Sequence, residues 1–180
     1  MKRSLKWAAL AAAAVAVLAT GCQSVPTTAL ETVPHVDLKR FMGDWYVIAN
    51  IPPFIEKGAH NSVESYQLDA DGTVAIAFNY RDGAVDGAAK RITSRGFVQD
   101  SVTNAIWGVQ FIWPIKADYR IVHLSDDYSQ VIVGREKRDY VWVMARTPQV
   151  SEADYKRLIS VVTRQGYDVR RIQKVPQKWN

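Results

Sequence analysis

Few side chains in this 180-residue sequence have the types and spacing that catalysis needs. The three histidines, His35, His60 and His123, are far apart and fit neither the HxH nor the HExxH spacing of a zinc site. The sequence has no GxSxG stretch for a serine nucleophile and no glycine-rich phosphate loop. Asp126 and Asp127 are neighbours on a turn, where carboxylates are usually solvated. These patterns predict a protein that is not an enzyme and that holds no metal or cofactor.

The single cysteine, Cys22, excludes an internal disulfide and a CxxC metal or redox site. It follows a basic start and an alanine-rich apolar run, residues 7–18, which is typical of an export signal and short for a bilayer span. Residues 18–22, Leu-Ala-Thr-Gly-Cys, resemble the lipobox of bacterial lipoproteins, with alanine where leucine is usual. The resemblance implies that residues 1–21 are a signal peptide, that Cys22 is acylated, and that Gln23 directs the protein to the outer membrane. The alternative is an ordinary secretory signal followed by a chance cysteine.

Composition and charge suggest one secreted domain rather than a nucleic-acid-binding protein. The formal net charge is +5, and subtracting the three basic residues of the signal, Lys2, Arg3 and Lys6, leaves +2. A charge this small, spread rather than striped, indicates no nucleic-acid partner. Residues 22–35 contain prolines and threonines without periodicity, which predicts a tether, and the folded domain is expected to span residues 36–180.

Short apolar runs separated by turn residues fill most of the chain after position 43, which predicts an all-β fold. The first run is apolar on both faces, so it must be covered on both sides. Periodicity alone leaves an antiparallel sandwich and a barrel equally open. The eight expected strands are residues 43–49, 62–68, 73–80, 90–98, 105–112, 117–124, 129–134 and 140–146.

Three short motifs in chain order resemble the lipocalin family, most closely its bacterial lipoproteins. They are Gly43-Asp44-Trp45 on the first strand, Asp118-Tyr119, and Arg146 after the last strand, within a resemblance that runs over residues 37–175. The resemblance implies an eight-stranded antiparallel up-and-down barrel with a C-terminal helix packed on its outside. It also implies that Arg146 packs over Trp45 and closes the base of the barrel, which is a structural role.

The C-terminal region has the clearest local signal for a helix. Ser151 and Asp154 have the spacing of a capping box, and an apolar stripe at helical period follows until Gly166. We expect this helix to lie on the outer wall against Val143 or Ile48. A final short strand is expected at residues 168–173.

The interior of the predicted barrel is apolar. Residues 50–60, with Pro52-Pro53 and three apolar side chains, are either a lid over the open mouth or an irregular connection that packs on its own core. Alternation along the strands leaves two outcomes open, a filled core or a lumen with a ligand cavity, and the resemblance favours the cavity. The side chains expected to line the lumen and bind ligand are Val47, Tyr66, Ile76, Phe78, Trp107, Val109, Trp142 and Met144.

The ligand expected from this lumen is a fatty acid or a lysophospholipid. A 16-carbon chain could gain at most about 12 kcal/mol from burial, at about 0.8 kcal/mol per methylene. Micromolar affinity needs only about 8 kcal/mol. Glu64 and His123 share the inward parity, so each is either a solvated residue at the mouth, which is the favoured interpretation, or a contact for the headgroup. The hypothesis is an outer-membrane lipoprotein that carries or stores these lipids. We expect it to face the periplasm rather than the cell surface, and a homodimer is one possible assembly. The alternatives are an envelope scaffold with a filled barrel and a lipid-modifying enzyme that uses His123 or Glu64.

Overall fold

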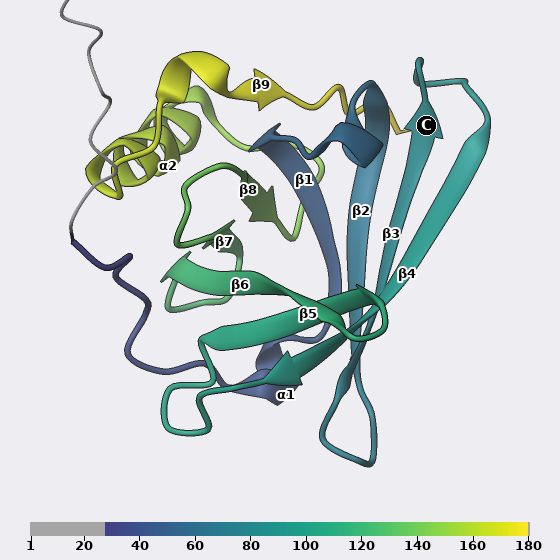
Figure 1. The fold of residues 1–180 in the computed structure, drawn as a ribbon. Coiled ribbons are helices and arrows are strands. Elements are labelled where there is room, and N and C mark those ends of the chain that lie inside the picture. Colours follow the sequence, from purple (N-terminus) through teal and green to yellow (C-terminus); the bar gives the residue numbers. More distant parts are fainter. Residues whose placement is uncertain (1–27, 180) are drawn as a thin grey trace, which may run out of the picture.

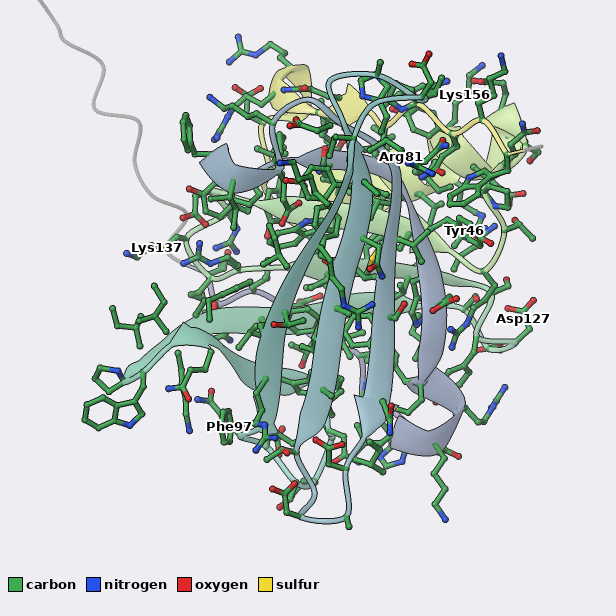
Figure 2. The ribbon with its side chains drawn as sticks, turned by 90° about the vertical axis from the view of Figure 1, so that its right-hand side faces the viewer. Tyr46, Arg81, Phe97, Asp127, Lys137 and Lys156 are labelled. Atoms are coloured by element: carbon green, nitrogen blue, oxygen red, sulfur yellow. The ribbon has the colours of Figure 1, made fainter. Side chains whose placement is uncertain are left out.

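The computed structural model describes residues 28–179 and contains one antiparallel sheet that closes into a barrel (Figures 1 and 2). Its strand order is β2-β3-β4-β5-β6-β7-β8-β1-β9, and β1 pairs again with β2. Strands β1 to β8 therefore form the predicted eight-stranded barrel, and the short strand β9 adds to β1. No helix within these residues is long and apolar enough to cross a membrane. The elements are α1 (Leu38–Phe41), β1 (Gly43–Ile51), η1 (Phe54–Glu56), β2 (Ala59–Leu68), β3 (Val74–Asp82), β4 (Ala89–Val98), β5 (Ile106–Ile112), β6 (Ile115–Leu124), β7 (Gln130–Gly134), β8 (Val141–Ala145), α2 (Glu152–Arg164), η2 (Val169–Arg171) and β9 (Gln173–Lys174).

A second apolar core lies outside the barrel, between its wall and α2 (Figure 1). The helix begins where predicted, because the Ser151 hydroxyl accepts a hydrogen bond from the Asp154 amide at 3.0 Å. Leu158 and Val162, both fully buried, pack in the same cluster as Val143, which is one of the two expected partners. The expected strand at 168–173 is wrong, because Asp168 caps η2 and only the two residues of β9 pair with β1.

At the base of the barrel Arg146 packs over Trp45, which is the contact that the family resemblance implies. Gly43 begins β1 with φ +93°, a conformation that a side chain would strain, so the strand turns sharply out of α1. Trp45 is fully buried and donates from Nε1 to the Phe41 carbonyl at 2.9 Å. The Arg146 guanidinium lies 3.7 Å above the indole ring and donates at 2.9 Å to the Phe41 and Met42 carbonyls. A single side chain thus covers the indole and satisfies carbonyl groups at the end of α1.

Residues 28–35 pack along the barrel, although the sequence suggested a tether over 22–35. Leu30 is buried in the outer core, and its amide donates to the Glu136 carboxylate at 3.2 Å. The Val33 amide donates to the Ile121 carbonyl at 3.0 Å. The structure therefore groups residues 28–35 with the folded domain. The expected signal peptide, Cys22 and the first part of the tether lie outside the described residues.

The seam between β1 and β2 is only partly closed by strand pairing. The two strands pair over Gly43–Tyr46 alone, and beyond that point they separate. The C-terminal tail fills the gap, because the Gln177 side-chain amide donates to the Val47 carbonyl at 2.9 Å and to the Ser62 carbonyl at 3.0 Å. The Asn61 amide also donates to a carbonyl of the tail, at 2.8 Å.

Candidate functional site: the lumen of the barrel

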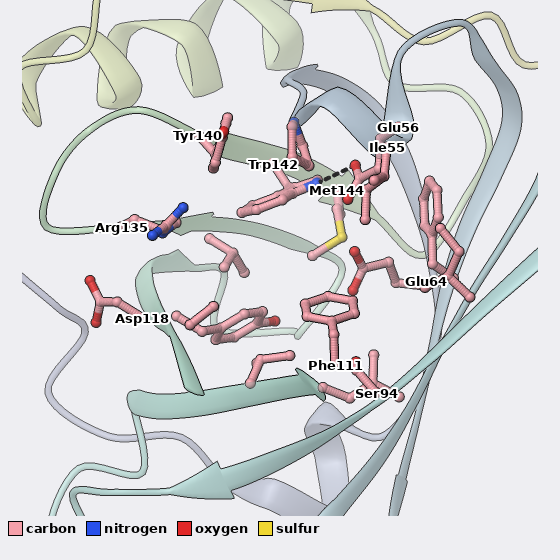
Figure 3. A pocket seen from close by; sticks show the side chains of 18 of the residues that line it. Ile55, Glu56, Glu64, Ser94, Phe111, Asp118, Arg135, Tyr140, Trp142 and Met144 are labelled. Carbon is pink, nitrogen blue, oxygen red and sulfur yellow. Dashed lines mark hydrogen bonds between the residues drawn. The ribbon is translucent and has the colours of Figure 1, made fainter. Parts of the chain in front are cut away.

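An apolar cavity of about 200 Å³ lies in the barrel between the lid loop and a layer of aromatic side chains (Figure 3). Below it, the rings of Phe41, Trp45 and Trp107 pack with centroids 5.3 to 5.5 Å apart and fill the lower lumen. Trp107 also stacks on Tyr119 at 5.1 Å. The lumen is therefore filled near its base and hollow above. The sequence left open a filled core and a ligand cavity, and the structure has a filled lower part and a cavity in the upper part.

Six of the eight residues expected to bind ligand line this cavity. They are Tyr66, Ile76, Phe78, Val109, Trp142 and Met144. Val47 and Trp107 are fully buried in the barrel core but are not among the side chains that line the cavity. Ligand binding by any of these side chains stays a prediction.

The loop between β1 and β2 forms one side of the cavity mouth, which is the place expected for a lid. Pro53 and Ile55 line the cavity, and the side chain of Phe54 is 82% exposed. Sequence analysis singled out the apolar residues of this loop and missed Glu56. The Glu56 side chain turns inward, where its carboxylate accepts a hydrogen bond from the indole nitrogen of Trp142 at 2.8 Å (Figure 3).

Two buried carboxyl groups face this apolar cavity, Glu56 from the lid and Glu64 from β2. Burial raises the pKa of Glu64 to about 7, although the Tyr66 hydroxyl, which donates to it, acts in the opposite direction. Burial raises the pKa of Glu56 to about 8, and the negative charge of Glu64 adds to this effect. The Tyr66 hydroxyl also contacts the Tyr119 hydroxyl at 2.9 Å. Both carboxyl groups therefore take up protons near neutral pH when nothing else balances their charge.

Comparison with known proteins identifies the family. Residues 36–177 match the sequence profile of the lipocalin-like domain. The chain is a lipocalin. It is 30% identical over 169 residues to the outer membrane lipoprotein Blc of Escherichia coli K12, covering 93% of this chain and 95% of that protein. It is 29% identical over 160 residues to temperature-induced lipocalin-1 of Arabidopsis thaliana, covering 82% and 83% of the two chains.

Solved structures support the same fold at low sequence identity. Insecticyanin from the tobacco hornworm Manduca sexta superimposes with a TM-score of 0.66 at 11% identity, covering 85% of this lipocalin and 86% of insecticyanin. Lobster apocrustacyanin A1 gives a TM-score of 0.62 at 12% identity, covering 86% and 94% of the two chains.

His123 lies outside the barrel of this lipocalin, so it is placed neither at the mouth of the lumen nor within reach of a headgroup inside it. The pairing of β6 with β7 shifts between Ile121 and His123, which moves the following side chains to the opposite face. His123 instead lines a groove beside α2 together with Arg157 and Arg164. Burial and these two arginines lower the pKa of His123.

The other charged side chains at the cavity of this lipocalin are already paired. Asp118 forms an ion pair with Arg120 at 3.0 Å and accepts the Glu136 amide at 2.7 Å. Arg135, a cation at the rim, forms an ion pair with Asp139 at 3.2 Å through Nη1, whereas its buried Nε has no hydrogen-bond partner within residues 28–179. Within residues 28–179, no group of three acidic, histidine or cysteine side chains is placed to hold a metal ion.

Proposed function

We propose that this lipocalin binds single-chain lipids, such as fatty acids or lysophospholipids, as an acylated lipoprotein of the outer membrane that carries or stores them in the envelope. The observation that supports it most directly is the apolar cavity under a lid that itself exposes apolar side chains. The similarity to an outer membrane lipoprotein supports the location. Acylation of Cys22 accounts for anchoring, because the several acyl chains of a lipoprotein hold it stably to a bilayer.

The volume of the cavity sets how much of the lipid is enclosed. At about 30 Å³ for a group the size of a water molecule, 200 Å³ holds about seven methylene groups. Burying seven of them gains about 5 to 6 kcal/mol, less than the roughly 8 kcal/mol of a micromolar complex. A longer chain must therefore extend through the mouth, along Ile55 and Phe111, which line the cavity and remain half exposed.

A chain-length series tests this proposal. The affinity of unbranched alcohols with 6 to 16 carbons is measured by quenching of tryptophan fluorescence, because Trp142 lines the cavity. We expect the affinity to rise about fourfold per methylene up to roughly eight carbons, and more slowly beyond that length. Replacing Phe111 by serine should weaken only the longer ligands, and Val102→Ser, at an exposed residue that does not line the cavity, is the matched control. Absence of binding at every chain length would refute the proposed function.

The scaffold and enzyme alternatives are weaker. A filled barrel does not fit the open upper lumen. Of the two side chains considered for a lipid-modifying enzyme, only Glu64 lies in the lumen, and His123 lies on the outside of the barrel.

A further inference from the structure

Glu56 and Glu64 are buried acids for which the described residues supply no counter-ion. Only 7% of Glu56 and 9% of Glu64 is exposed. Within residues 28–179, neither side chain forms an ion pair, in contrast to Asp118 at the same cavity. Figure 3 shows both carboxyl groups turned toward the space between the lid and the barrel wall.

Hydrogen bonding alone does not explain why these positions are acids. The indole of Trp142 and the hydroxyl of Tyr66 donate to the two carboxyl groups. A glutamine carbonyl would accept the same bonds without the desolvation free energy of a buried charge. Two neighbouring acids in an apolar cavity repel one another when ionised, so they make the empty lumen less stable above neutral pH.

A cationic group in the cavity would offset both the desolvation free energy of the buried carboxylates and the repulsion between them. An ammonium group has three donors and can bond to two carboxylates, and such charge-assisted bonds are the stronger kind. Its charge also offsets the repulsion between the two acids. A fatty-acid carboxylate in the same place adds a third acid to an already crowded group. Because Glu56 belongs to the lid and Glu64 to β2, a cation between them also joins the lid to the barrel wall.

We propose that the lumen recognises amphiphiles whose polar end is an ammonium group, with Glu56 and Glu64 as its counter-ions beneath the lid. This assignment rests on the proposed function, because it requires the alkyl chain to occupy the apolar cavity. It narrows the ligand class to single-chain amines and aminolipids.

Three ligands with the same 12-carbon chain and different polar ends separate the chain from the headgroup. Dodecylamine, dodecanol and dodecanoic acid are titrated at pH 7, below their aggregation limits, into the full mature chain. We expect the amine to bind at least about tenfold more tightly than the alcohol, which is the scale of one charge-assisted hydrogen bond, and the acid no more tightly than the alcohol. Calorimetry in two buffers of different ionisation enthalpy should also show proton release with the amine alone, since its charge ionises carboxyl groups that are protonated in the empty cavity.

Charge-removing variants test the two acids themselves. Glu64→Gln and Glu56→Gln should each reduce the amine-to-alcohol affinity ratio at least about tenfold, whereas Glu152→Gln, at an exposed acid far from the lumen, should leave it unchanged. Using the ratio corrects for any loss of folded protein in a variant. Equal or tighter binding of the acid than of the amine, or an unchanged ratio in both lumen variants, overturns the assignment while the proposed function stands. If none of the three ligands binds, the proposed function and the assignment both fall.

Discussion

Removal of the Arg146 side chain should destabilise the barrel more than removal of any surface arginine. Its guanidinium lies 3.7 Å above the Trp45 ring, a cation–π contact that contributes roughly 0.5 to 2 kcal/mol. It also donates to the carbonyls of Arg40, Phe41, Met42 and Asp44 at 2.8 to 2.9 Å. Bonds from a charged donor contribute about 1.5 to 3 kcal/mol each where water is excluded, and much less at a half-buried site where water can replace them. We therefore expect Arg146→Ala to lose about 2 to 4 kcal/mol.

For a chain of this size, that loss corresponds to a melting temperature lower by roughly 5 to 15 °C. The assay is thermal unfolding followed by far-ultraviolet circular dichroism. Arg146→Lys keeps the charge with fewer hydrogen-bond donors, so its melting temperature should lie between those of the parent and Arg146→Ala. The control is Arg170→Ala, whose side chain is 81% exposed and pairs only with Asp168, so its melting temperature should change by no more than about 2 °C. A melting temperature for Arg146→Ala within about 1 °C of the parent would refute the closing role given to this arginine.

Two further predictions follow from the lid and the seam. The pKa of Glu56 in the folded protein, about 8, lies above the 4.5 that is ordinary for a glutamate, so the folded state binds the extra proton. The free energy of unfolding should therefore fall from about pH 4.5 to about pH 8, by at most about 1.4 kcal/mol per pH unit for this group. Chemical denaturation at several pH values should show this slope, and Glu56→Gln should flatten it; a variant with the parent's slope would contradict the reasoning. Gln177→Ala removes both side-chain hydrogen bonds across the gap between β1 and β2, so it should lower the free energy of unfolding by about 1 to 3 kcal/mol. Gln173→Ala, at an exposed residue of β9, is the control.

The sequence predicted the parts of the fold that depend on strong local patterns. The alternation of apolar residues located eight strands, and the Ser151 cap located the helix. The contact of Trp45 with Arg146 was predicted from the family resemblance, because 100 residues lie between the two and spacing cannot show a contact of this kind.

The errors share a physical cause, which is that tertiary contacts override local pattern. A register shift in β6 turns His123 outward, and strict alternation gives no sign of it. Residues 28–35 lack periodicity yet pack on the barrel through backbone hydrogen bonds and one buried leucine. Glu56 was missed because an acid in an apolar loop is ordinarily solvated, although its place just after Pro52-Pro53 was the available signal.

The C-terminal tail, which crosses the gap between β1 and β2, also affects the order in which the protein can fold. The contacts that close the barrel join β1 to the last quarter of the chain, through β8, Arg146 and Gln177. A chain that emerges amino end first, from a ribosome or a channel, lacks these C-terminal segments at the start. It can therefore complete its tertiary structure only when nearly all of it has emerged. Closure of the barrel, and of the cavity inside it, is therefore a late step in folding.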